Sequence, residues 1–145
     1  MSSIYRLTPQ SYSNLRRLLS IKTKPLGKIL QEADLISPFQ LESALSNQVQ
    51  YPDLRIGEIL AQDGLIKPET ADFFVHDWSK VVMEAEKNAL GYYLQQAAIL
   101  DQEQIETVLA EQRSTGVRYG TVAVIQGYIK STTQDFFLAK LFPEG

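Results

Sequence analysis

The sequence predicts an all-α protein made of two tandem helical-repeat domains of paired helix-turn-helix units, preceded by an N-terminal helix. The prediction rests on a sequence motif of about two dozen residues that occurs four times. In each copy the apolar residues have helical spacing, and turn or cap residues separate the helical segments. The clearest copy runs from Leu26 to Gln48. Pairing its glycines as 27 with 91 and 57 with 120 gives spacings of 64 and 63, which indicates a duplicated pair. The repeat glycines are Gly27, Gly57, Gly91 and Gly120.

Length and composition are those of a globular protein. A chain of 145 residues can bury a core without disulfides or metals. No run approaches the roughly 20 apolar residues of a membrane span. The first residues lack the apolar segment of a secretory signal, and the chain has no cysteine. We therefore expect a cytoplasmic protein without a membrane span.

Charge is distributed unevenly along the chain. The first 30 residues carry six basic side chains and no acidic one, whereas the other 115 residues carry 8 basic and 17 acidic ones. The excess of acidic side chains in these 115 residues argues against generic nucleic-acid binding. The basic segment, which includes Arg16 and Arg17, is either a solvated helix face or a docking arm for an anionic partner.

Residues 1–24 predict one helix and a linker. Thr8 is typical of a helix cap and Pro9 of a first helical turn. Apolar residues then share one helical face, namely Tyr12, Leu15, Leu18 and Leu19. The linker runs from Lys22 to Pro25, because a proline disfavours helix in the residue before it.

Each repeat predicts a short helix, a tight turn and a second, better-capped helix. The turn residues are Asp34, Gly64, Ala98 and Gly127. Glycine readily takes the left-handed conformation that ends a helix, whereas alanine tolerates it poorly, so we expect the third turn to be altered or strained. Capping boxes, in which a cap residue stands three positions before a glutamine, are expected at Ser37, Asp101 and Ser131.

The helix that begins at Pro68 is expected to run to about Lys87 and to join repeat pair 1 (residues 25–87) to repeat pair 2 (residues 88–145). Its apolar residues recur at steps of three and four, as in an amphipathic helix. The predicted buried stripe contains Ala71, Phe74, Val75, Trp78, Val81, Val82 and Ala85.

The sequence offers no pattern that predicts catalysis. His76 is the only histidine and has no cysteine to join it in a metal site, so we expect it to be a partly exposed structural residue. Serines lack a nucleophile-base constellation, and neither a GxxxxGK[ST] loop nor a GxGxxG motif occurs. We therefore expect no enzymatic activity, no metal and no cofactor.

The repeat glycines and two arginines leave two interpretations open. Unpaired N–H groups at a helix start favour anions, and a missing Cβ admits a flat ligand. Arg55 and Arg118, each two residues before a repeat glycine, can bind a phosphate or a guanine edge with two hydrogen bonds. Alternatively, small residues at helix starts permit close helix packing and the arginines are solvated. The residues by themselves favour packing.

The repeated motif resembles the MshEN family, the N-terminal domain of type II secretion and type IV pilus assembly ATPases. The family pattern, Arg-Leu-Gly-x-x-Leu-x-x-x-Gly-x-Ile-x-x-x-x-Leu-x-x-x-Leu-x-x-Gln given twice, is similar to residues 25–141 of this chain as two tandem domains without the ATPase. Pro25 and Ala89 stand where the pattern has its first arginine, and Asp34 and Ala98 stand where it has the second glycine.

Many members of this family bind cyclic di-GMP, so the resemblance implies two ligand sites. The first would contain Gly27, Leu41, Leu45, Gln48, Arg55 and Gly57. The second would contain Gly91, Ile105, Leu109, Gln112, Arg118 and Gly120. We predict a non-catalytic regulatory or adaptor protein that contacts a protein partner, such as a pilus or secretion ATPase. The alternative is a sensor of cyclic di-GMP, or a related nucleotide, that signals to such a partner.

Overall fold

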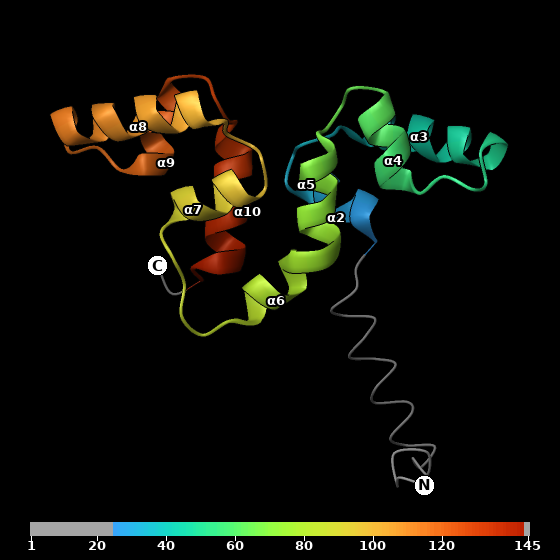
Figure 1. Cartoon of the computed structure of the whole chain (residues 1–145), viewed down its shortest axis with the longest axis horizontal. Coiled ribbons are helices and arrows are strands. Elements are labelled where there is room, and N and C mark those ends of the chain that lie inside the picture. Colours follow the sequence, from blue (N-terminus) through green and yellow to red (C-terminus); the bar gives the residue numbers. More distant parts are fainter. Residues whose placement is uncertain (1–24, 144–145) are drawn as a thin grey trace, which may run out of the picture.

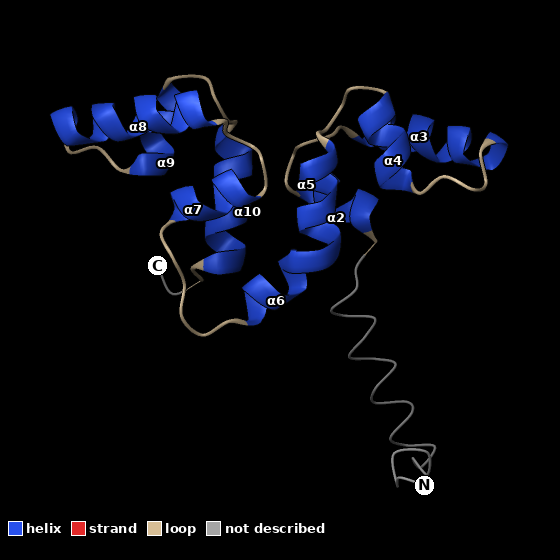
Figure 2. Cartoon of the chain, viewed as in Figure 1, coloured by secondary structure: helices blue, strands red, loops and turns tan. Residues whose placement is uncertain are grey.

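The computed structural model describes residues 25–143, and every regular element in that range is helical (Figure 1, Figure 2). The predicted all-α class is therefore confirmed. The predicted N-terminal helix and its basic side chains, Arg16 and Arg17 among them, lie outside the described residues. Within residues 25–143, no helix combines the length and the apolarity that crossing a bilayer requires.

Four short helices have the same length and end in the same way. Each has seven residues, and they are α2 (Leu26–Glu32), α4 (Ile56–Gln62), α7 (Leu90–Gln96) and α9 (Tyr119–Ile125). After each helix the backbone becomes left-handed, with φ angles of 56°, 75°, 56° and 79° at Asp34, Gly64, Ala98 and Gly127. The next N–H donates to the carbonyl five residues back, as Leu35 does to Leu30 at 2.9 Å, which is a Schellman closure.

The third turn was expected to be altered or strained; it has the same geometry as the others, and only the strain is present. Ala98 has the same φ angle as Asp34, and Ile99 donates to Leu94 at 2.9 Å as its counterparts do. A residue with a Cβ costs about 1–2 kcal/mol in this backbone region. The strain is therefore confined to the dihedral angles of Ala98 and does not change the path of the chain.

Two of the three predicted capping boxes are present. The Ser37 hydroxyl accepts the N–H of Gln40 at 3.0 Å, and the Gln40 side chain accepts the N–H of Ser37 at 2.8 Å, at the start of α3 (Pro38–Gln50). Asp101 makes the same pair of bonds with Gln104 at the start of α8 (Gln102–Thr115).

The third predicted box, at Ser131, is not present. Lys130 is the cap residue of α10 (Ser131–Leu141), and Ser131 is already the first residue of the helix. The Gln134 amide lies against Gly120 rather than turning back to the helix start, so no box can form. The prediction placed the cap one residue too late.

The helix from Pro68 is interrupted by a π-helical turn and ends earlier than predicted. It consists of α5 (Pro68–Asp72), the π-helical turn η2 (Phe73–Asp77) and α6 (Trp78–Met83). It stops before Glu84, which adopts an extended conformation with φ −66° and ψ 133°. The predicted end near Lys87 was therefore wrong.

The π-helical turn changes which side chains of this helix are buried. A π turn has a wider hydrogen-bond spacing than an α-helix and so shifts the phase of the apolar face. Phe73, Phe74 and Trp78 are buried, whereas Val75 is 50% exposed. Ala85 lies beyond the helix and is exposed. Val75 and Ala85 were thus wrongly placed in the buried stripe, and Phe73 was missed.

The two halves of the described chain have matching helix boundaries. We call residues 25–87 the first half and residues 88–143 the second half. Helix α7 begins 64 residues after α2, at Leu90 against Leu26. Helix α9 begins 63 residues after α4, at Tyr119 against Ile56. We call residues equivalent when these spacings relate them, and the division into two domains stays a prediction.

The halves pack against each other through two equivalent threonines and an aromatic cluster. Thr133 donates to the Ala33 carbonyl at 2.7 Å, and its equivalent Thr70 donates to the Ala97 carbonyl at 2.6 Å. Between them, the rings of Phe74 and its equivalent Phe137 lie 6.1 Å apart. The buried side chains of both halves belong to one cluster. Helices α3 and α4 extend to one side of this centre, and α8 and α9 to the other (Figure 1).

The strain at Ala98 can be measured by substitution. We expect Ala98→Gly to stabilise the protein by about 1 kcal/mol, because glycine removes the Cβ that disfavours the left-handed conformation. Gly127 also has a positive φ, and we expect Gly127→Ala to destabilise the protein by about 1 kcal/mol. A Cβ there would meet no atom within 4 Å, so only the backbone conformation is affected. Urea denaturation measures both. An Ala98→Gly protein no more stable than the wild type contradicts this account.

Candidate functional site

The repeat glycines lie where helices pack closely against neighbouring side chains. A Cβ at Gly27 would lie 2.5 Å from the Cδ1 atom of Leu41, and one at Gly91 would lie 2.7 Å from the Tyr119 ring. Both distances are far below van der Waals contact. Neighbouring side chains therefore fill the space that the resemblance assigns to a ligand at these two glycines.

The other two glycines make equivalent contacts in the two halves. A Cβ at Gly57 would lie 2.9 Å from Leu26 Cδ2, and one at Gly120 would lie 2.9 Å from Leu90 Cδ2. These contacts join α2 to α4 and α7 to α9. The missing Cβ thus allows close approach of the short helices in each half.

The first predicted ligand site is only partly assembled. Arg55 and Gly57 line one hollow of about 570 Å³, which we call the Arg55 hollow. The predicted companions do not line it. Leu41 is buried in the core, Leu45 is 46% exposed, and the Gln48 amide donates to the Leu54 carbonyl at 3.2 Å.

The Arg55 hollow contains residues that the sequence reasoning did not assign to a site. Its lining includes His76, Asp72 and Glu58 together with several apolar residues. Glu58 accepts the backbone N–H of Arg55 at 2.8 Å. His76 is exposed and belongs to the π-helical turn, so its position depends on a feature that regular helical periodicity does not predict. The only available signal was that His76 is the sole histidine.

The equivalent region of the second half is more filled. Gln134 lies against Gly120, where its equivalent Ala71 has only a methyl group near Gly57. Arg118 caps α9 and its side chain is exposed. Of the predicted companions, Ile105 is buried, Gln112 is half-buried and Leu109 is 38% exposed.

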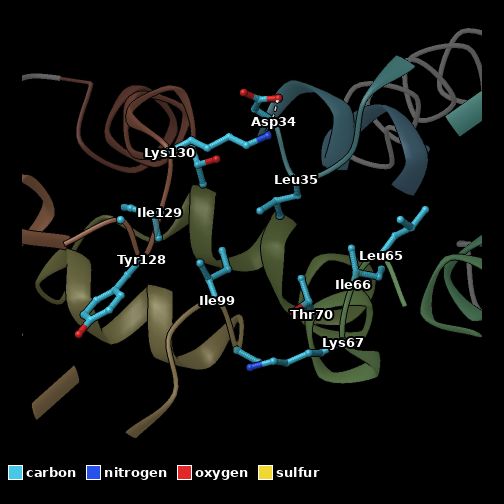
Figure 3. A pocket seen from close by; sticks show the side chains of 13 residues that line it. Asp34, Leu35, Leu65, Ile66, Lys67, Thr70, Ile99, Tyr128, Ile129 and Lys130 are labelled. Carbon is cyan, nitrogen blue, oxygen red and sulfur yellow. Dashed lines mark ion pairs between the residues drawn. The ribbon is translucent and has the colours of Figure 1, made fainter. Parts of the chain in front are cut away.

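A second cavity lies between the two halves, where residues of all four turns meet (Figure 3). This central pocket has a volume of about 430 Å³. Its walls are largely the apolar residues that follow each turn, and its charged residues are Asp34, Lys67 and Lys130. The sequence analysis did not predict this pocket, because the pocket exists only when the two halves meet.

Asp34 links the halves at the rim of the central pocket. The Thr132 hydroxyl donates to its carboxylate at 2.5 Å, and Lys130 Nζ lies 3.6 Å from the other oxygen. The hydroxyl and, more weakly, the Lys130 charge hold the pKa of Asp34 below its ordinary value of 3.8. Among the described residues, no group of three or more acidic or histidine side chains is arranged to hold a metal ion.

No protein-family model and no solved structure matches this chain. An uncharacterized protein of Picosynechococcus sp. is 40% identical over 120 residues. The match covers 83% of this chain and 65% of that protein, so this chain spans less than two thirds of its relative's length. The relative's name gives no activity. Because the relative is longer than the matched region, a function of its whole length would not transfer directly to this chain.

The role of the repeat glycines can be tested at Gly57. We expect Gly57→Ala to destabilise the protein by about 1–3 kcal/mol, because the new Cβ would overlap Leu26 and press on the Ala71 methyl group at 3.2 Å. Arg55→Ala is the matched control, since this exposed side chain makes no cap bond, and we expect a change within about 0.5 kcal/mol. Thermal and urea unfolding measure both. If Gly57→Ala is as stable as the wild type, close packing does not require this glycine.

Proposed function

We propose that this chain is a non-catalytic adaptor that acts through protein–protein contacts, and that it docks its partner on the outer side of α3. The observation that carries the proposal is a concentration of large exposed apolar side chains on this helix and its C-cap. They are Phe39, Leu45, Val49 and Tyr51, with exposures of 75%, 46%, 80% and 56%. Leu45 and Val49 are one helical turn apart and therefore adjacent.

The equivalent helix α8 supports this interpretation because it holds the same place in the second half. Phe39, Val49 and Tyr51 are equivalent to exposed Glu103, Arg113 and Thr115. The helix therefore forms equally well with polar side chains at these positions. Leu45 is matched by the exposed Leu109, but the other three residues have polar equivalents, and several exposed apolar residues found in one half alone point to a contact with another molecule.

The class of partner comes from the resemblance to MshEN domains. Those domains are joined to type II secretion and type IV pilus ATPases, so we propose an ATPase of this kind as the partner. Protein side chains pack against the repeat glycines, so a bound nucleotide is not needed to fill the space there. This packing is consistent with an adaptor role.

The docking surface can be tested by giving α3 the residues of α8. We expect the Phe39→Glu, Val49→Arg, Tyr51→Thr variant to bind a purified pilus or secretion ATPase at least about tenfold more weakly than the wild type. Its unfolding free energy should stay within about 1 kcal/mol of the wild type, since all three side chains are exposed.

The matched control is Arg113→Ala on α8, which should leave binding unchanged. Calorimetry or surface plasmon resonance gives the affinities. Wild-type protein that does not bind, or a triple variant that binds like the wild type, counts against the proposal.

A cyclic di-GMP sensor is the alternative, and the Arg55 hollow favours it. The volume of this hollow lies in the range of small-molecule sites, and Arg55 at its edge has the planar donor group that binds phosphates and guanine. A sensor using this hollow predicts micromolar or tighter binding of cyclic di-GMP that Arg55→Ala abolishes and Arg118→Ala leaves intact. If isothermal titration with cyclic di-GMP releases no heat at high ligand concentration, the sensor alternative is wrong and the adaptor proposal stands.

A further inference from the structure

The central pocket contains two equivalent lysines in unequal surroundings. Lys130 faces the carboxylate of Asp34 at 3.6 Å. Its equivalent is Lys67, and the equivalent of Asp34 is Ala98, so Lys67 has a methyl group where Lys130 has a carboxylate. Lys67 has no carboxylate partner among residues 25–143. Asp34 therefore neutralises the charge of Lys130 on one side of the pocket. On the other side, no described carboxylate neutralises the charge of Lys67.

Several apolar side chains lie between the two lysines. Figure 3 shows Lys67 and Lys130 on opposite sides of the pocket, with Leu35, Ile66 and Ile99 between them. The two threonine hydroxyls that border the pocket already donate to backbone carbonyls of the opposite half. A ligand here would thus meet apolar side chains, the Asp34–Lys130 ion pair on one side, and on the other side Lys67, which has no carboxylate partner among the described residues.

We propose that the central pocket binds a small carboxylic acid with an apolar chain. Its carboxylate pairs with Lys67, as Asp34 pairs with Lys130, and its hydrocarbon chain packs on the apolar residues of the four turns. A volume of about 430 Å³ lies in the range of sites that enclose small molecules. This site is separate from the outer side of α3, so it holds whether or not that helix docks a partner.

Glu69, which lies close to Lys67 in the chain, limits the expected affinity for a carboxylate ligand. On the Asp34 side, the Thr132 hydroxyl also donates to the carboxylate. The equivalent of Thr132 is Glu69, which is exposed and supplies no donor when ionised. Binding of the ligand carboxylate therefore depends mainly on Lys67. Glu69→Thr adds the missing hydroxyl and removes a repelling charge, and should strengthen binding.

The probe is octanoate, titrated into the whole chain with ¹³C-labelled isoleucine methyl groups. We expect saturable shifts of the methyl signals of Ile66, Ile99 and Ile129, which lie at the pocket, with Ile29 and Ile59 unaffected. Octanol, which has the same chain length without the charge, should bind at least about tenfold more weakly, since a bond to a charged group is lost.

Two variants test the role of the unpaired lysine. Lys67→Gln should weaken octanoate binding about tenfold or more. Ala98→Asp should do the same, because it supplies the carboxylate that Lys67 lacks, and Asp34 already occupies the equivalent turn at the same φ of 56°. Lys28→Gln, the same charge change on an exposed side chain of α2, is the control and should leave binding unchanged.

Three results would overturn the proposal. The first is the absence of any saturable shift at millimolar octanoate. The second is a set of shifts centred on isoleucines away from the pocket. The third is unchanged affinity in both Lys67→Gln and Ala98→Asp, with their methyl spectra showing that both variants are folded.

Discussion

The arrangement of this protein depends on two reciprocal hydrogen bonds between its halves. Thr133 of the second half donates to the Ala33 carbonyl of the first, and Thr70 of the first donates to the Ala97 carbonyl of the second. Both hydroxyls are buried, so each bond satisfies a group that would be costly to leave unpaired. Because the bonds hold the end of each first helix against the opposite half, all four turns meet around one pocket and α3 and α8 extend outward.

The two halves serve as controls for each other. Some positions with the same residue type in both, such as Gly57 and Gly120, make the same helix contacts and are explained by folding. Positions that differ are not required by the shared fold. Phe39, Val49 and Tyr51 at α3 and the replacement of Asp34 by Ala98 belong to this second group. The functional proposals rest on these differences.

Much of the fold could be predicted from the sequence because its signals are local. Left-handed turn residues and the capping boxes at Ser37 and Asp101 depend on neighbours a few residues away. The π-helical turn was not predictable, because helical periodicity assumes a constant phase and so misplaced Val75. The candidate site was harder still. A glycine without a Cβ serves a ligand or a packed side chain equally well, and only the position of Leu41 beside Gly27 decides between them. The central pocket depends on contacts about 100 and 27 residues apart in sequence, which no local pattern contains.

The most direct measurement of the central claim is the unfolding free energy of Thr133→Val, with Thr133→Ser as control. Valine keeps the shape of the side chain but leaves the Ala33 carbonyl without its donor, so the account predicts a loss of about 1–3 kcal/mol. Serine retains the hydroxyl and should lose less. A Thr133→Val protein as stable as the wild type, or more stable, would contradict the claim that these bonds hold the two halves together.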